Sequence, residues 1–443
     1  MEIKRILIAN RGEIALRALR TIKEMGKEAV VVYSTADKDA LYVRYADVAI
    51  CIGKERSSDS YLNIPAIISA AEISEADAIF PGYGFLSENQ NFVEICSHHK
   101  LKFIGPSVAA MALMSDKSKA KQVMQRAGVP VIPGSDGAVA DTKAAKELAK
   151  KIGYPVILKA AAGGGGRGMR VVEREEDIEK AFWSAESEAM SAFGDGTMYM
   201  EKYILNPRHI EVQIIGDSHG NVLHIGERDC SMQRRHQKLI EESPAILLDE
   251  ATREKLHETA IKAAKAIGYE GAGTFEFLVD KNLDFYFIEM NTRLQVEHCV
   301  SEMVSGLDII ELMIKVAQGE ALPPQESIAL KGHAIECRIT AEDPNTFTPS
   351  PGKITKYVCP GGRNVRMDSH IYQDYSIPPY YDSMIGKLIV WDTDRNRAIR
   401  KMKVTLEQLI IGGIKTTRDF HIAMMENQDF IDNNYDTNYL SRH

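Results

Sequence analysis

The chain has 443 residues, of which 44% are hydrophobic and 26% are charged, and its formal net charge is −8. This composition is typical of a soluble globular protein of two to four domains. The negative charge argues against a nucleic-acid-binding protein or one held on anionic lipid, and no apolar run is long enough to span a bilayer. The six cysteines form no CxxC pair, and the N-terminus has no signal-peptide core. We therefore expect a cytoplasmic protein with reduced thiols and without nucleic-acid or membrane partners.

The first part of the chain alternates strands and helices, which predicts a parallel, Rossmann-like sheet with helices on both faces. The first turn, Asn10-Arg11-Gly12-Glu13, has a single glycine and lacks the G-x-G-x-x-G pattern. A dinucleotide site is therefore not expected there. The expected strands are residues 5–9, 29–33, 78–80 and 102–104, and the expected helix is 13–25.

A glycine run lies between two predicted strands, residues 156–160 and 170–172. The run, Gly163 to Gly168, allows backbone N–H groups to approach phosphate oxygens closely. No Lys-Ser/Thr pair follows it, so it is not a Walker A loop. Lys159 at the end of the first strand could reach a phosphate as a point charge. A flexible surface loop is the alternative. Helices are expected nearby at 117–127, 142–152 and 177–189.

The short strand 198–200 ends at four residues whose backbone could face a purine: Glu201, Lys202, Tyr203 and Ile204. An ordinary strand end is the alternative. His209 then begins the alternating strand 209–215.

Further on, Arg234, Arg235, His236 and Lys238 gather in a stretch without periodicity. Such clustering in an acidic protein favours an anion pocket, and a solvated positive loop is the alternative.

A hairpin is predicted where the strand 274–280 meets a second strand that includes Phe287. If Asn282 and Leu283 form the tip, Glu276 pairs across from Glu289, and Glu289 and Asn291 point the same way. Two carboxylates about 4 Å apart repel by roughly 4 kcal/mol at an effective dielectric of about 20. A shared proton or a divalent cation offsets that repulsion, and these oxygen ligands suit Mg²⁺ carrying a nucleotide's phosphates. A solvated face with unrelated acids is the alternative.

Beyond the hairpin, an extended continuation places Arg293, Gln295 and Glu297 on the side that Glu289 and Asn291 face.

A helix is expected at 307–317. Residues 318–331 contain a glycine and two prolines and are typical of a domain boundary. After this boundary, short strands and turns are expected to dominate, with one helix near 397–410. A lone arginine there, Arg338, is by default a surface residue.

Seven motifs in chain order resemble the biotin carboxylase family of ATP-grasp enzymes, over residues 3–439. They are Ile8 to Ala15, Pro81 to Asn89, Lys159 to Met169, Glu227 to Lys238, Glu289 to His298, Glu336 to Arg338 and Tyr381 to Lys387. The resemblance implies an α/β and α+β fold: a Rossmann-like N-terminal domain (1–114), an ATP-grasp domain (115–330) with a mobile glycine-loop lid (131–203), and a mixed α+β C-terminal domain (331–443). Cys299 stands where the family commonly has proline, and Thr340 where asparagine is common.

The resemblance also implies roles for single residues. Nucleotide contacts are expected at Lys117, Lys159, Gly165, Gly166, Glu201, Lys202, Tyr203, Ile204, His209, Gln233 and His236. Glu276, Glu289 and Asn291 are expected to hold Mg²⁺ or Mn²⁺. Bicarbonate is expected at Lys238, Arg293, Gln295, Val296 and Glu297. Biotin is expected at Arg338, with Tyr83 and Gly84 nearby.

The implied activity is ATP- and bicarbonate-dependent carboxylation of biotin through carboxyphosphate. Glu297 is expected to act as base, and Arg338 to stabilise the biotin anion. No Met-Lys-Met biotinylation site is present. The biotin is therefore expected on a carrier protein that also serves carboxyltransferase subunits, in acetyl-CoA carboxylase of fatty acid synthesis or in a split pyruvate or other acyl-CoA carboxylase. A homodimer is expected, with surfaces near Arg20 and Arg366. An amide-forming ATP-grasp ligase and a catalytically dead scaffold are the rival hypotheses.

Overall fold

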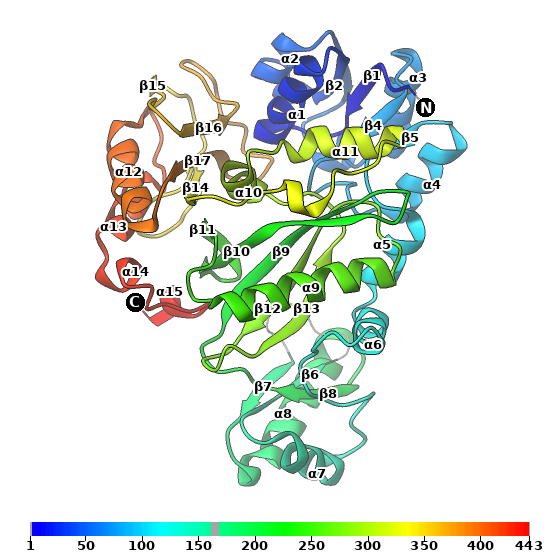
Figure 1. The fold of residues 1–443 in the computed structure, drawn as a ribbon, viewed down its shortest axis with the longest axis vertical. Coiled ribbons are helices and arrows are strands. Elements are labelled where there is room, and N and C mark those ends of the chain that lie inside the picture. Colours follow the sequence, from blue (N-terminus) through cyan, green and yellow to red (C-terminus); the bar gives the residue numbers. More distant parts are fainter. Residues whose placement is uncertain (1, 161–167, 443) are drawn as a thin grey trace. The chain divides into compact units, whose positions relative to one another are not determined.

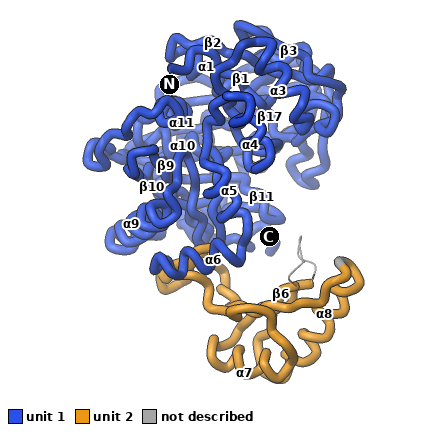
Figure 2. Tube along the Cα trace, turned by 90° about the vertical axis from the view of Figure 1, so that its right-hand side faces the viewer, with its two compact units in different colours: residues 1–129, 208–277, 289–443 blue, residues 130–207, 278–288 orange. Residues whose placement is uncertain are grey.

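The computed structural model describes residues 2–160 and 168–442. The chain divides into two compact units (Figure 2). Unit 1 comprises Met1–Val129, Arg208–Phe277 and Glu289–His443, and unit 2 comprises Pro130–Pro207 and Leu278–Ile288. None of the helices in the described ranges combines the length and the apolar character that a membrane crossing needs.

Unit 1 begins with a parallel sheet whose strand order is β3-β2-β1-β4-β5 (Figure 1). The apolar runs of its central strands are buried on both faces, as the neighbouring residues Ile6 and Leu7 show with 0% exposure each. This topology confirms the predicted Rossmann-like sheet, and the predicted strands are correct to within one residue. The elements are β1 (Arg5–Ile8), α1 (Gly12–Glu24), β2 (Glu28–Ser34), α2 (Leu41–Tyr45), β3 (Val48–Gly53), α3 (Ile64–Ile73), β4 (Ala78–Phe80), α4 (Gln90–His98), β5 (Lys102–Phe103), α5 (Val108–Ser115) and α6 (Lys117–Arg126).

A second, eight-stranded sheet has the order β13-β12-β9-β10-β11-β14-β17-β16. It runs through the predicted boundary near residue 330, because β11 pairs with β14. The three-domain division stays a prediction. The strands are β9 (Arg208–Gly216), β10 (Val222–Arg234), β11 (Gln237–Ser243), β12 (Gly271–Val279), β13 (Phe285–Asn291), β14 (His333–Thr340), β16 (Val365–Ser369) and β17 (Met384–Asp392), and the helices between them are α9 (Glu250–Ala266), α10 (His298–Ser305) and α11 (Ile309–Gln318).

The part of the chain after residue 332 differs from the prediction. Three of its five described strands have three to five residues, as expected, whereas β14 and β17 are longer, with eight and nine residues. In the described part, three further helices follow α12 (Arg395–Gln408), so the expectation of one helix is wrong. The remaining elements are β15 (Lys356–Val358), β18 (Ile410–Gly412), α13 (Arg418–Glu426), α14 (Gln428–Ile431) and α15 (Tyr439–Arg442). Helices of one or two turns are too short to produce a periodic pattern.

Unit 2 contains a three-stranded antiparallel sheet, in the order β7-β6-β8, packed against two helices. Its core includes Leu158, Phe182 and Met200, all 2% exposed or less. The strands that flank the glycine run are confirmed, whereas the last helix and the last strand extend beyond their predicted ends. The elements are α7 (Thr142–Ile152), β6 (Val156–Ala160), β7 (Met169–Val172), α8 (Ile178–Phe193) and β8 (Met198–Lys202). Most of the glycine run, including Gly165 and Gly166, lies outside the described residues.

Candidate active site

Strands β10 and β11 form a hairpin that carries Lys238 at the start of its second strand. Gln233 pairs with Lys238, and the tip consists of Arg235 and His236, whose φ angles are +49° and +64°. The segment is therefore a strand and a tight turn rather than a stretch without periodicity, so the expectation of an irregular segment is wrong. The charged residues conceal its alternation. The tip is exposed to solvent, but Lys238 is not.

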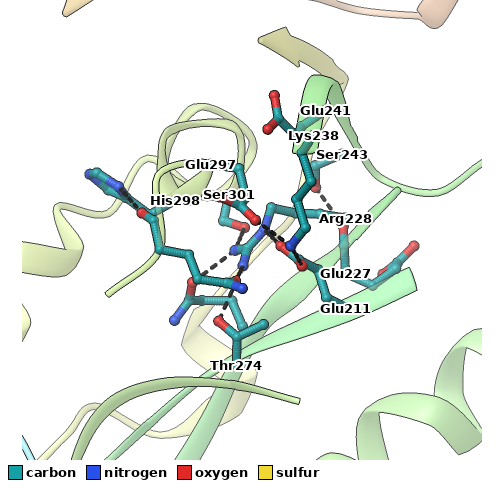
Figure 3. A network of polar contacts seen from close by, with 12 residues as sticks. Glu211, Glu227, Arg228, Lys238, Glu241, Ser243, Thr274, Glu297, His298 and Ser301 are labelled. Atoms are coloured by element: carbon teal, nitrogen blue, oxygen red, sulfur yellow. Dashed lines mark hydrogen bonds and ion pairs between the residues drawn. The ribbon is translucent and has the colours of Figure 1, made fainter. Parts of the chain in front are cut away.

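Lys238 lies among three carboxylates, and Figure 3 shows two of them, Glu211 and Glu297. Its Nζ is 2.5 Å from Glu211 Oε2, 2.6 Å from Glu297 Oε1 and 3.2 Å from Glu276 Oε1. Burial alone would lower the pKa of Lys238, but the three carboxylates raise it well above its ordinary value. The residue is therefore a fixed ammonium ion whose charge is balanced by these carboxylates.

Glu297 stands immediately before α10, and its two oxygens meet two different cations. Oε1 accepts from Lys238, and Oε2 accepts from Arg338 Nη2 at 2.9 Å. The side chain is buried, which alone would raise its pKa, but Lys238 and Arg338 lower that pKa well below its usual range. Glu297 is therefore an ionised carboxylate, a proton acceptor held by charge-assisted hydrogen bonds.

Arg228 lies underneath this cluster and is completely buried. Its guanidinium donates to Glu211 Oε1 and Gln295 Oε1 at 2.6 Å each. Gln295 in turn donates to Glu276 Oε1 at 2.7 Å, so Arg228 positions both an acid and an amide of the site. Its other acceptors are Gln213, Ser301 and Thr274.

Glu211 and Arg228 were not among the predicted site residues, although Arg228 lies within the Glu227 to Lys238 motif. The signal was available, because Glu211 and Gln213 alternate with Ile210, Val212 and Ile214 in a strand whose other face is apolar. Both polar side chains are nevertheless buried. A charged residue in such a strand indicates a polar interior, but the sequence does not identify the residue that pairs with it.

The predicted metal ligands lie on β12 and β13. Asn291 Nδ2 donates to Glu276 Oε1 at 2.6 Å, and His209 Nε2 is 3.0 Å from Glu276 Oε2. Burial would raise the pKa of Glu276, but Lys238 and His209 lower it far below its usual range, so the group is ready to bind a cation. Glu289 is partly exposed, and its Oε2 lies 3.4 Å from Lys117 Nζ.

This donor set fits a divalent cation, since it offers carboxylate and amide oxygens on the neighbouring strands β12 and β13. Glu211 enlarges the set, because ligand atoms of His209, Glu211 and Glu276 all lie within 4.8 Å of one another. The placement of Glu276 directly opposite Glu289 stays a prediction.

The segment after β13 bends at residues 292–293 and turns at 296–297 before α10 begins. The expectation of an extended continuation is therefore wrong, and strand alternation does not place these side chains. Arg293 donates to Glu88 Oε2 and Asn291 Oδ1, each at 2.9 Å. Among the described residues it has no hydrogen bond to Lys238 or Glu297. The carbonyl of Val296 accepts from Lys387 Nζ at 2.7 Å.

The predicted biotin residues lie at the carboxyl end of the first sheet and on β14. Tyr83 donates its hydroxyl proton to Glu13, and its carbonyl accepts from Asn10 Nδ2 at 2.8 Å. Gly84 has a φ of +69°, a conformation that favours glycine. Arg338 donates through Nε to Glu241 Oε1 at 2.5 Å. Its side chain is therefore shared between Glu241 and Glu297, and the default of a surface arginine is wrong.

The predicted nucleotide residues belong to both units. In unit 2, Lys159 Nζ is 2.6 Å from Glu201 Oε2, and Lys202 Nζ donates to the carbonyls of Gly153 and Tyr154 at 2.9 Å each. The N–H groups of Lys202 and Tyr203 donate to backbone carbonyls within the same unit, and Ile204 is buried. Unit 1 carries the others: Lys117, His209, Gln233, His236, Glu276 and Glu289.

A Rossmann-like sheet, a large antiparallel sheet that carries buried acidic residues and a second compact unit together match the fold of an ATP-grasp enzyme. Comparison with family models agrees: residues 116–325 match the ATP-binding domain of the carbamoyl-phosphate synthase L chain. Residues 2–111 and 336–442 match the N-terminal and C-terminal domains of biotin carboxylase. The chain belongs to the biotin carboxylase family, as the sequence motifs predicted.

Known proteins resemble this chain over its whole length. A biotin carboxylase from Nostoc is 56% identical over 442 residues, which are 99% of each chain. The crystal structure of a biotin carboxylase from Campylobacter jejuni, described as a β,γ-ATP complex, is 84% identical, covers 100% of this chain and 99% of that one, and has a TM-score of 0.93. The biotin carboxylase domain dimer of Hydrogenobacter thermophilus 2-oxoglutarate carboxylase, with MgADP, ADP and bicarbonate, is 49% identical, covers 100% and 98%, and has a TM-score of 0.91.

Proposed function

We propose that this enzyme carboxylates biotin on a separate carrier protein, using ATP and bicarbonate. The observation that carries the proposal is the Glu297 carboxylate, which is buried and held between the Lys238 ammonium and the Arg338 guanidinium. A proton acceptor between two cations suits a reaction that binds a small anion, removes its proton and then stabilises a second anion.

Bicarbonate is a poor electrophile and has to be activated. In the proposed reaction Lys238 and Arg293 hold it, together with Gln295 and the backbone of Val296, and Glu297 takes its proton. The freed oxygen attacks the γ-phosphorus of ATP, ADP leaves, and carboxyphosphate forms. Carboxyphosphate splits into CO₂ and phosphate, the phosphate takes the N1 proton of biotin, and N1 attacks CO₂. Arg338 stabilises the biotin anion, and Tyr83 and Gly84 line its approach.

Glu276, Glu289 and Asn291 are the proposed ligands of Mg²⁺ or Mn²⁺, which supplies positive charge to the phosphate oxygens when bound. Nucleotide contacts are proposed at Lys117, Lys159, His209, Gln233, His236 and the Glu201 to Ile204 segment. The Hydrogenobacter thermophilus neighbour with MgADP and bicarbonate supports this assignment. Residues 131–203, nearly all of unit 2, are the proposed lid of a three-domain enzyme.

The partners are proposed on chemical and family grounds. A carrier protein presents biotin, and carboxyltransferase subunits use the product, which the full-length match to a biotin carboxylase from Nostoc supports. Acetyl-CoA carboxylase in the cytoplasm is the proposed complex. A pyruvate or other acyl-CoA carboxylase is the second candidate, since one solved neighbour is the biotin carboxylase subunit of a pyruvate carboxylase. The Hydrogenobacter thermophilus neighbour is described as a dimer, which supports a homodimer.

The test is ADP release by the purified chain with ATP and magnesium. We expect release to depend on bicarbonate and to increase with free biotin, and ¹⁴C-bicarbonate to enter carboxybiotin. An amide-forming ligase would require an amine acceptor instead, and a dead scaffold would bind ATP without cleaving it. Either result would refute the proposal. The biotinylated protein that co-purifies with the chain distinguishes acetyl-CoA carboxylase from the other complexes.

A further inference from the structure

Two buried glutamates outside the proposed reaction face each other in the second sheet. β11 pairs with β14 in a register that places Glu241 opposite Glu336, and both side chains are 0% exposed. Directly opposed residues in an antiparallel pair have Cβ atoms about 4.5–5.5 Å apart. Figure 3 shows Glu241 on the same strand as Lys238. The two carboxyl groups are therefore neighbours at the edge of the proposed active site.

These carboxyl groups have few partners. Glu241 Oε1 accepts from Arg338 Nε at 2.5 Å. Glu241 Oε2 and both oxygens of Glu336 have no hydrogen-bond partner among the described residues. Buried polar atoms are nearly always hydrogen-bonded, and an ionised carboxylate without partners is costly inside a protein. Two ionised side chains here would leave three such oxygens, whereas one proton lets one acid donate to the other.

The surrounding cations do not stabilise two ionised carboxylates at this position. The charged groups that face the pair are Arg338 on β14, Lys238 on β11, Lys387 on β17 and Glu297 before α10. Burial raises the pKa of the neighbouring thiols, so they stay neutral; they are Cys230, Cys299 and Cys337. Lys238 is already held by three carboxylates, and Lys387 binds the Val296 carbonyl and lies 3.3 Å from Glu13. Arg338, which is shared with Glu297, is thus the one cation in direct contact with the pair among the described residues.

The electrostatics agree with this geometry. Burial raises the pKa of Glu241 to about 7, although Arg338 opposes the rise. Burial also raises the pKa of Glu336 well above its ordinary value against the attraction of Lys387, and the facing Glu241 adds to the rise. Both shifts point in the direction that a shared proton requires.

We propose that Glu241 and Glu336 share one proton near neutral pH, and that the charge of Glu241 sets how strongly Arg338 can stabilise the biotin anion. This inference rests on the role of Arg338 in the proposed function. When Glu241 is neutral, the guanidinium charge is available to biotin. When Glu241 ionises at higher pH, its carboxylate competes for that charge. Glu241 and Glu336 are thus positioning residues that act through Arg338.

The test compares two rates from about pH 6 to about pH 9, a range that brackets the expected titration. One rate is biotin carboxylation, and the other is bicarbonate-dependent ATP cleavage without biotin. In the wild-type enzyme their ratio should fall as Glu241 ionises. Glu336→Gln removes the facing acid, so the midpoint of this fall should move down by about one pH unit or more. Glu241→Gln should abolish the fall. Glu258→Gln, an exposed side chain on α9, is the control and should leave the profile unchanged.

A purely structural role would lower both rates at every pH without moving the midpoint, and that result would overturn the proposal. Infrared difference spectroscopy of the wild-type protein provides a readout that needs neither activity nor a folded variant. A protonated carboxyl band should be present near neutral pH, should disappear at higher pH, and should be lost in Glu336→Gln if that variant folds. Absence of the band in the wild-type protein would also overturn the proposal. Loss of all biotin-dependent activity with the band intact would instead refute the proposed function.

Discussion

Replacing Glu297 by glutamine tests the proposed base, because the amide has nearly the same shape and cannot accept the proton. A positioned general base contributes about 10²- to 10⁴-fold to a rate, so bicarbonate-dependent ADP formation should fall by that factor. At 1.36 kcal/mol for each tenfold, the barrier rises by about 3 to 5 kcal/mol. The fold should survive the change. Lys238 keeps Glu211 and Glu276 at 2.5 and 3.2 Å, and Arg338 keeps Glu241.

The assay is steady-state ADP release at saturating ATP and bicarbonate, together with calorimetric titration of the nucleotide. Nucleotide affinity should stay within a few-fold of wild type, since no predicted nucleotide contact is removed. Glu258→Gln serves again as the exposed control. A fall of less than tenfold in ADP release, with affinity unchanged, would remove Glu297 from the role of base. If nucleotide affinity fell as much as the rate of ADP release, Glu297 would contribute to nucleotide binding rather than to proton transfer.

Three other predictions address different parts of the structure. Arg338→Ala should reduce biotin carboxylation more than biotin-independent ATP cleavage, and equal losses of the two rates would contradict its assignment. Arg228→Met should lower the free energy of unfolding by about 3 kcal/mol or more in urea denaturation, because Glu211 loses its buried partner at 2.6 Å; a loss below about 1 kcal/mol would refute this. Burial would raise the pKa of Glu227, but His257 and Arg253 lower it to about 2. Its stabilisation is therefore complete above the ordinary pKa of 4.5 and is lost as the pH falls towards 2. Glu227→Gln should thus be less stable than wild type at neutral pH and should lose less stability over that range, and parallel pH curves for the two proteins would contradict the assignment.

The sequence predicted four of the five described strands of the first sheet and the helix α1, because buried parallel strands appear as apolar runs and α1 is amphipathic. Residues 6–8 and 29–32 are examples of such runs. The helix α9 did not enter the prediction, although Asp249 caps it by accepting from the Thr252 N–H. Its buried face consists largely of alanines such as Ala260 and Ala264, which give a weak hydrophobic signal.

The acidic hairpin was predicted from two strands and a short connection, because strand alternation fixes which side chains share a face. The arrangement around Arg228 could not be predicted in this way. Its partners Glu211 and Gln295 lie 17 and 67 residues away, and only strand order and register bring them together. The prediction for Arg293 was wrong for a different reason. Strand alternation was extended through a segment that bends, and the guanidinium contacts Glu88 instead.

The low pKa of Glu297 needs to be reconciled with its proposed role, since an efficient base has a pKa near the working pH. The same two cations that lower it are the ones proposed to receive the substrates. Bicarbonate bound at Lys238 takes up part of the charge that the ammonium gives to Glu297, and a second anion close by raises the pKa of the carboxylate further. Glu297 is therefore a weak base as long as Lys238 and Arg338 contact no other anion. Its pKa rises, and it becomes a stronger base, when bicarbonate is bound. On this argument Lys238→Gln would raise the resting pKa of Glu297 and still abolish turnover, because the charge that attracts the anion is the charge that restrains the base.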